Sequence, residues 1–147
     1  MKTKTVAISV VGVLVAASIL LSGCGAATRP SAAAAATPAE VVENFYGWYL
    51  EYSEKANPLA DKVYRSSEYL SEGFVEEVDA LIASFDRGGY DPFLCAQDVP
   101  TSVTVGEAEV AGGEAIVPVE TAFVGHGFSV VLQDVEGRWL ITAVICR

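Results

Sequence analysis

The chain has 147 residues, with 9 lysine and arginine residues against 19 aspartate and glutamate residues and a formal net charge of -10 at pH 7. Apolar residue types make up 52% of the sequence and charged types 19%, which excludes a disordered or collagen-like chain. The negative charge excludes a protein that coats nucleic acid, because such proteins carry a basic stripe. The length allows one folded domain.

The first 23 residues have the organisation of an export signal. Lys2 and Lys4 give a positive start, an uncharged apolar run spans residues 6–21, and small residues follow it. As a helix, this run of 16 residues would rise about 24 Å, short of the roughly 30 Å hydrocarbon core of a bilayer. The sequence therefore predicts a signal peptide over residues 1–23 rather than a permanent transmembrane anchor.

The signal ends in Leu21-Ser22-Gly23-Cys24, which resembles the lipobox of bacterial lipoproteins. In a lipobox the cysteine receives a diacylglycerol and becomes the first mature residue, so the resemblance implies acyl chains such as palmitate on Cys24. The alternative is an ordinary secretory signal with an incidental cysteine. Because position, small neighbours and apolar run agree, we predict an exported protein that is lipid-anchored to a bacterial membrane, in the cell envelope.

Processing at Cys24 would remove two lysines and no acidic residue, leaving 7 basic against 19 acidic residues, a net charge of -12. Such a surface repels phosphate backbones, so no nucleic-acid partner is expected. It also disfavours lying flat on anionic lipid headgroups. The expected membrane contact is therefore the lipid anchor itself.

Residues 24–36 are expected to be a flexible tether, because they are small and carry no large apolar side chain. Thr37-Pro38-Ala39-Glu40 then has the form of a helix capping box with proline at the first helical position. The folded domain is therefore expected to span residues 37–147. Its first helix should end at Asn57-Pro58. Its apolar stripe would consist of Val41, Phe45, Trp48, Tyr49 and Tyr52.

Two further helical segments are expected before the sheet. One, continuous or interrupted, covers about 59–70. The other begins at Ser71 and should stop at Gly88-Gly89. Its apolar positions have helical spacing and are Phe74, Val78, Leu81, Ile82 and Phe85.

After Pro100 the apolar period changes from about 3.6 to 2 residues, as in strands. Four strands are expected, over about 102–110, 114–123, 128–132 and 138–146. Pro118 indicates an edge or a bulge in the second of them. Because short turns join these strands, they should form an antiparallel meander covered by the helices. The predicted fold class is α+β, with N-terminal helices packed on a curved four-stranded sheet.

The segment YDPFLCAQDVP at residues 90–100 lies between a helix with the pattern FYxWYL and a last strand with the pattern GxWxIxxVxC. Together these patterns resemble the DUF3828 family of bacterial lipoproteins, over nearly all of residues 37–147. The resemblance implies a cone of the NTF2-like, or cystatin-like, type, with a cavity between the helices and a strongly bent sheet. It implies no activity, because that family has no established biochemical function.

Cys95 and Cys146 remain as an even pair if Cys24 is acylated. In an exported domain such a pair favours a disulfide, here closing a loop of about 51 residues. The alternatives are two free core thiols and a reactive thiol at Cys95. The cysteines lack Cys-x-x-Cys spacing and the chain has one histidine, so no metal site and no other cofactor are expected. That histidine, His126, is expected to be a surface turn residue rather than a catalytic base, because two glycines flank it.

Asp91 and Asp98 flank the Cys95 segment. Some NTF2-like enzymes use a cavity aspartate as general base, but Asp91-Pro92 first indicates a turn in which the carboxylate caps backbone N–H groups. Asp98 could cap in the same way. Buried tyrosine hydroxyls need partners and often line cavities. The other candidates for a pocket wall are Tyr49, Tyr52, Tyr64 and Trp139.

No catalytic constellation is evident in the sequence. The main interpretation is a non-catalytic module that binds a small apolar ligand, an envelope protein or a wall component. One alternative is an enzyme with Asp91 or Asp98 as base, which predicts a deep cavity with a desolvated carboxylate. Another is an inhibitor or immunity-type protein, which predicts a filled cavity and an exposed recognition loop such as Gly88–Gln97. NTF2-like sheets often pair, so the resemblance also leaves a homodimer open, with Pro118 as the feature that argues against it.

Overall fold

The computed structural model describes residues 35–86 and 88–147. The signal peptide, the acylation of Cys24 and almost all of the tether lie outside these residues and stay predictions. The described elements, in chain order, are α1 (Pro38–Ser53), a 3-10 turn (Val63–Ser66), α2 (Glu72–Ala83), β1 (Val103–Val105), β2 (Glu109–Ala111), β3 (Glu114–Thr121), β4 (Gly127–Val135) and β5 (Arg138–Cys146). The predicted α+β class is confirmed.

Helix α1 begins where the capping box predicts. The Thr37 hydroxyl accepts a hydrogen bond from the Glu40 N–H at 3.3 Å, and the Glu40 carboxylate accepts one from the Thr37 N–H at 2.7 Å. Each side chain thus satisfies a backbone donor that the first turn leaves free. The buried face is broader than the predicted stripe. Its fully buried members are Val42, Phe45, Tyr46 and Tyr49, whereas Trp48 and Tyr52 are only half-buried.

The segment between α1 and α2 is a series of turns. Of the helical stretch expected over 59–70, continuous or interrupted, only the 3-10 turn Val63–Ser66 forms. The Asn57 side chain accepts from the N–H groups of Leu59 and Ala60, both at 3.0 Å. This hydrogen bonding is typical of asparagine in turns and at the start of helices. Lys62 then adopts a left-handed conformation with φ +55°, which interrupts helical winding and leaves one 3-10 turn.

Helix α2 starts as predicted, with the Ser71 hydroxyl accepting from the Phe74 N–H at 3.2 Å. It ends at Ala83, before the predicted stop at Gly88-Gly89. The Ser84 hydroxyl donates to the Leu81 carbonyl at 2.7 Å, so this serine bonds within the last turn. Side-chain competition for backbone groups ends the helix earlier than the glycines would.

The sheet is antiparallel, with strand order β1-β3-β4-β5, and β2 pairs with the other half of β3. The expected first strand over 102–110 is therefore two strands, and the sheet has five strands rather than four. The break lies opposite Pro118, as the predicted irregularity requires. The Gly106 N–H donates to the Pro118 carbonyl at 2.8 Å, but Pro118 has no N–H to return, so the ladder is interrupted. A Cβ at Gly106 would lie 2.8 Å from Pro118 Cγ, which explains why a glycine lies there.

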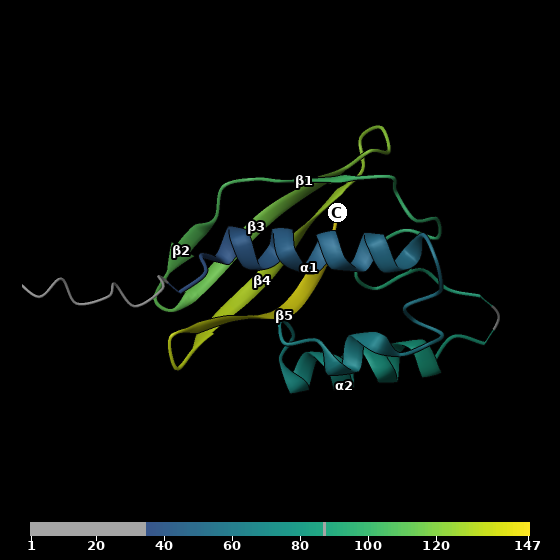
Figure 1. The fold of residues 1–147 in the computed structure, drawn as a ribbon, viewed down its shortest axis with the longest axis horizontal. Helices are drawn as coiled ribbons and strands as arrows, with labels where there is room; N and C mark the ends of the chain where they lie inside the picture. Colours follow the sequence, from purple (N-terminus) through teal and green to yellow (C-terminus); the bar gives the residue numbers. More distant parts are fainter. Residues whose placement is uncertain (1–34, 87) are drawn as a thin grey trace, which may run out of the picture. The chain divides into compact units, whose positions relative to one another are not determined.

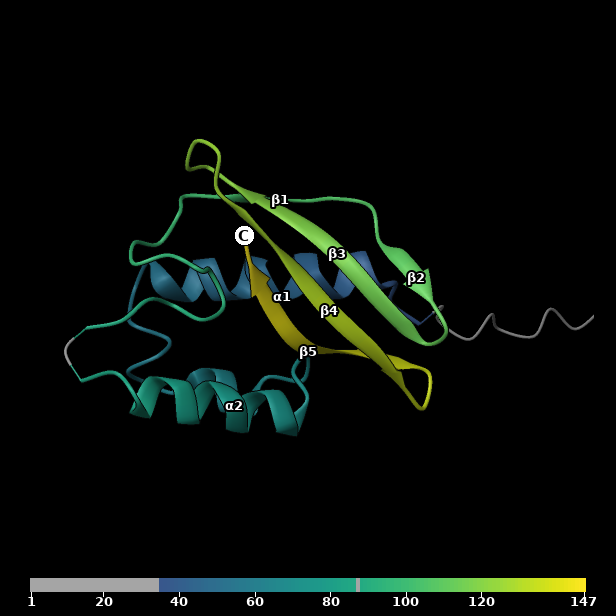
Figure 2. The same ribbon diagram turned by 180° about the vertical axis from the view of Figure 1, so that it is seen from behind.

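Helix α1 covers one face of the sheet and packs against β1, β3 and β5, while α2 packs against β5. In Figure 1 α1 lies in front of the strands, and in Figure 2 the strands lie in front of it with no helix over them. A register shift between Val131 and Leu132 interrupts the β4–β5 pairing. Such a bulge bends a strand.

Aromatic rings fill the space between the helices and the sheet. Phe93 is at the centre, fully buried. Its ring centroid lies 5.3 to 5.8 Å from those of four other rings, Phe45, Tyr49, Tyr64 and Phe74. The NTF2-like resemblance implies a cavity at this position, whereas side chains of the described residues occupy it.

Candidate binding surface

The six residues expected to form a pocket do not meet around one cavity. Tyr49 and Tyr64 are buried in the aromatic core, and Asp98 is exposed. The Tyr52 hydroxyl donates to Asp61 at 3.0 Å at the surface. Trp139 lines a separate shallow cleft. The structure brings together one pair of the six, Tyr49 and Asp91, whose hydroxyl and carboxylate oxygens are 2.6 Å apart.

The Asp91 carboxylate has the predicted turn role. Its Oδ1 accepts from the N–H groups of Phe93 at 2.8 Å and Leu94 at 3.2 Å, and its Oδ2 accepts from the Tyr49 hydroxyl. Burial raises the pKa of Asp91, although these three hydrogen bonds act in the opposite direction. Burial likewise raises the pKa of Tyr49, and the charge of Asp91 adds to that effect. Both carboxylate oxygens accept hydrogen bonds from groups of the core, so Asp91 has a structural role in this turn.

Removing the Tyr49 hydroxyl should destabilise the domain. In Tyr49→Phe, Asp91 Oδ2 would lose its donor in a buried place, which lowers the free energy of unfolding by about 1–3 kcal/mol. The matched control is Tyr52→Phe, whose hydroxyl bonds a carboxylate at the surface and whose loss should change stability by less than about 0.5 kcal/mol. Urea unfolding of both variants measures the difference. Equal effects would contradict a structural role for the buried pair.

The raised pKa of Asp91 gives a pH dependence of stability. The folded chain holds this proton to a higher pH than an aspartate at its ordinary value of 3.8. The contribution of Asp91 to the free energy of unfolding therefore falls as the pH rises from below 3.8 through the raised pKa. Asp91→Asn lacks this titration, so the stability of the unmodified chain relative to the variant should decrease across that window. Denaturant unfolding at a series of pH values tests it, and a relative stability that increases with pH would be the opposite result.

The segment Gly88–Gln97 was expected to project as a recognition loop in an immunity-type protein, and that expectation was wrong for its middle part. Pro92, Phe93 and Leu94 are buried, because their side chains complete the aromatic core. The Asp91 N–H donates to the Ala96 carbonyl at 2.7 Å, which closes the segment on itself. Residues 91–96 therefore fold into the core instead of projecting as a loop, and we call this segment the plug.

A disulfide joins Cys95 to Cys146, as the sequence predicts, with 5.5 Å between the Cα atoms. Cys95 has a left-handed backbone with φ +53°, which directs the chain sharply at the end of the plug. The bond ties the plug to the last residue of β5. The disulfide thereby joins the plug and the end of β5, which are distant in sequence, into one unit.

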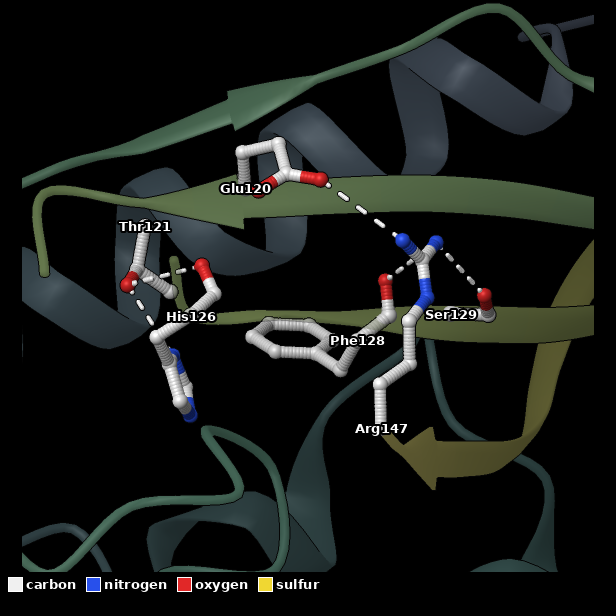
Figure 3. Close-up of polar contacts among 6 residues, drawn as sticks. All are labelled: Glu120, Thr121, His126, Phe128, Ser129 and Arg147. Carbon is white, nitrogen blue, oxygen red and sulfur yellow. Dashed lines mark hydrogen bonds and ion pairs between the residues drawn. The ribbon is translucent and has the colours of Figure 1, made fainter. Parts of the chain in front are cut away.

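His126 holds the hairpin between β3 and β4 to this joined unit through Cys95, and Figure 3 shows its contacts with Thr121 within the hairpin. The His126 ring nitrogen Nε2 lies 3.1 Å from the Cys95 carbonyl oxygen, and Nδ1 lies 3.0 Å from the Thr121 hydroxyl. Since a carbonyl only accepts, Nε2 carries a hydrogen, and in the neutral ring Nδ1 accepts from Thr121. His126 is thus a turn residue as predicted, but it is half-buried rather than at the surface. Its ring packs edge-on against Phe123 and Phe128, with centroids 6.0 and 6.4 Å away.

Arg147 fastens the other side of the hairpin. Its guanidinium donates to the Ser129 hydroxyl at 3.0 Å and to the Phe128 carbonyl at 3.4 Å, and it lies 3.6 Å from the Glu120 carboxylate (Figure 3). These contacts connect the end of the chain to both β3 and β4. Sequence reasoning did not single out Arg147, because nothing in a sequence shows that a terminal arginine lies across a hairpin.

The tip of this hairpin presents two large apolar side chains. The Phe123 carbonyl accepts from the His126 N–H at 3.2 Å, and Gly125 has φ +70°, which gives a closed β-turn. Val124 at its corner is completely exposed, and 37% of the Phe123 surface is accessible. Sequence reasoning missed both residues. A usable signal was present, since two apolar residues immediately before a Gly-His-Gly turn have no strand neighbour to cover them.

Two other surface features could contact a ligand. An open cleft of about 370 Å³ lies beside the ends of α1 and α2, and its lining includes Phe85, Tyr90, Asp91 and Val99. A second feature is the face of the sheet that α1 does not cover. Its apolar side chains alternate along β3, β4 and β5 with the buried ones and are Ile116, Val131, Ala143 and Ile145.

The charge of the described residues is strongly negative. They include all 19 acidic residues of the chain but 5 of its 9 basic ones, since Lys2, Lys4, Arg29 and Arg87 lie outside them. Three ion pairs occur among them, each with an exposed or partly exposed partner. Within residues 35–86 and 88–147, no group of histidine, cysteine and acidic side chains could hold a metal ion. No helix of that part of the chain is long and apolar enough to cross a membrane.

The fold is similar to that of chains in two crystal structures of one complex. One is the type VI native effector–immunity complex Tae3–Tai3 from Ralstonia pickettii, with a TM-score of 0.61 and 24% sequence identity, covering 75% of this chain and 94% of that chain. The other is the selenomethionine form of the same complex, with a TM-score of 0.58 and 23% identity, covering 75% and 96%. No family model matches the chain. No curated protein matches it at a significant level.

Proposed function

We propose that this chain is an immunity-type protein of the cell envelope, which binds and restrains an effector protein. The observation that carries the proposal is the fold shared with a chain of the Tae3–Tai3 complex over most of both lengths. In that complex an effector and an immunity protein are bound together, so the shared fold is one that takes part in protein–protein contact.

Three features of the chain favour the immunity role over the effector role. The interior is filled by aromatic rings, which leaves the outer surface for recognition. Both nitrogens of His126 are hydrogen-bonded, and Cys95 and Cys146 are joined to each other. The histidine and both cysteines of the described residues are thus committed to structure, as suits a binding protein.

The predicted export signal and lipid anchor fit this proposal. An immunity-type protein anchored through Cys24 would meet an incoming effector outside the cytoplasm, where a disulfide between Cys95 and Cys146 is stable. Membership of the DUF3828 family, the NTF2-like type of the fold and a homodimer remain further proposals. The partner proposed for the domain is a protein, rather than a small ligand held inside it.

The proposal is tested by protection and binding together. Tae3 from Ralstonia pickettii and the effectors of the bacterium that encodes this chain are directed, one at a time, to the periplasm of a laboratory strain, with and without the full chain. We expect the chain to restore growth against one of them and to bind the same purified effector. Absence of both protection and binding for every effector would overturn the proposal. A matched control is the chain with the signal residues removed, which should not protect although it should still bind.

A further inference from the structure

We propose that Phe123 and Val124, at the tip of the β3–β4 hairpin, insert into the protein partner. The partner is an effector protein, and the tip would occupy an apolar pocket on its surface that is bordered by basic side chains. This inference rests on the proposed function and adds the surface and the chemistry of its partner. The experiment below is chosen so that the two can fail separately.

A closed, hydrogen-bonded turn keeps the side chains of the tip exposed. The His126 N–H bonds the Phe123 carbonyl at 3.2 Å, the Thr121 N–H bonds the His126 carbonyl at 3.0 Å, and the Phe123 N–H bonds the Thr121 hydroxyl at 3.2 Å. A turn with its backbone groups paired keeps Val124 outward in the free protein. Rigid presentation of an apolar side chain reduces the entropy lost on binding.

The base of the hairpin is held from two directions. His126 bonds the Cys95 carbonyl, and Cys95 is bonded covalently to Cys146. On the other side Arg147 contacts Glu120 and Ser129 (Figure 3). A bare exposed valine needs no explanation by itself. Here, however, Phe123 and Val124 lie together on a turn that an imidazole, a disulfide and a guanidinium hold in place, so an apolar pair is presented rigidly, which lowers the cost of binding.

The negative charge of this domain indicates that the partner surface carries basic side chains. The described residues carry 19 acidic against 5 basic side chains, and three of the basic ones are already in ion pairs. A partner surface with basic side chains around the pocket would be attracted to this domain, and association should slow as salt is added. The same charge opposes insertion of the tip into an anionic bilayer.

The experiment measures the affinity of the effector identified above for variants of the full chain carrying Cys24→Ser, which keeps it unacylated. Val124→Lys places a positive charge at the tip, which both an apolar pocket and its basic border would oppose, so it should weaken binding at least about tenfold. Val124→Ala should weaken binding less. The matched control is Val110→Lys in β2, because Val110 is also largely exposed, at 56%, and the substitution should leave the affinity within about twofold. Equal melting temperatures of the variants exclude unfolding as the cause.

The outcomes separate the two proposals. Binding by the unmodified chain with no loss in Val124→Lys overturns the hairpin inference but keeps the immunity role. Absence of binding by the unmodified chain to any effector overturns both. A further arm uses vesicles of phosphatidylcholine and phosphatidylglycerol: sedimentation of the Cys24→Ser chain with them, abolished by Val124→Asp, would show that the tip is a membrane element and contradict a protein pocket as its occupant.

Discussion

Replacing Phe93 by alanine should lower the free energy of unfolding by about 3–5 kcal/mol, the range for deleting a large buried aromatic side chain. The ring is fully buried and its centroid lies within 5.8 Å of four other rings. Its removal would leave a void that the sheet and α1 cannot close by small shifts. Equilibrium urea unfolding, with unchanged slope, measures the loss.

Phe85→Ala is the control for this substitution. Phe85 is half-buried, and Tyr90 is an aromatic neighbour of its ring, 5.6 Å away. Its removal should cost clearly less than that of Phe93. If the two variants had the same stability, Phe93 would not be the centre of the core, and the filled interior on which the proposed function depends would be in doubt.

Loss of the Cys95–Cys146 disulfide is the second large expected effect. The bond closes a loop of 51 residues, and in the chain-entropy account such a cross-link contributes about 4 kcal/mol by restricting the unfolded chain. The double variant Cys95→Ser/Cys146→Ser should therefore unfold at a much lower urea concentration. Its hairpin should also move, because Cys95 supplies the carbonyl that holds His126.

A reductant provides the internal control for the disulfide. Dithiothreitol should destabilise the unmodified chain to the level of the double variant and should leave the double variant unchanged. Labelling of the unreduced, denatured chain by a thiol reagent at Cys95 or Cys146 would contradict the disulfide itself. Loss of less than about 1 kcal/mol would mean that the cross-link is not a main source of stability.

The parts of the fold that local chemistry determines could be predicted from the sequence. The Thr37 and Ser71 caps locate both helix starts, and alternating apolar residues locate β3, β4 and β5. Pro118 predicts the irregularity in β3, although its effect appears in the partner strands β1 and β2. The 59–70 segment could not be predicted, because the left-handed backbone of Lys62 interrupts it. The end of α2 could not be predicted either, because the Ser84 hydroxyl bonds a carbonyl of the last turn.

The candidate site was harder to predict for a physical reason. The pairing of Cys95 with Cys146 could be predicted, because an exported chain with two remaining cysteines favours a disulfide. The turn role of Asp91 could be predicted from the Asp-Pro pair. The sequence also placed tyrosines around a cavity. A tyrosine whose hydroxyl is bonded within the core could not be distinguished from one whose hydroxyl faces a cavity, because both have the same sequence pattern. Tyr49 and Tyr64 each bond a carboxylate at 2.6 Å, which satisfies the hydroxyl without a cavity. The contacts of His126 and Arg147 join residues more than 15 positions apart, and no local pattern encodes them.

The most direct test of the account is hydrogen exchange of the full chain, carrying Cys24→Ser, free and bound to the effector that it neutralises. The amides of residues 121–127 should exchange more slowly in the complex, and the aromatic core should be unchanged. Slower exchange in the aromatic core, with the hairpin amides unaffected, would contradict an outer surface as the place where the partner binds. Slower exchange only around the cleft beside Tyr90 would keep an outer surface but contradict the hairpin as the binding element.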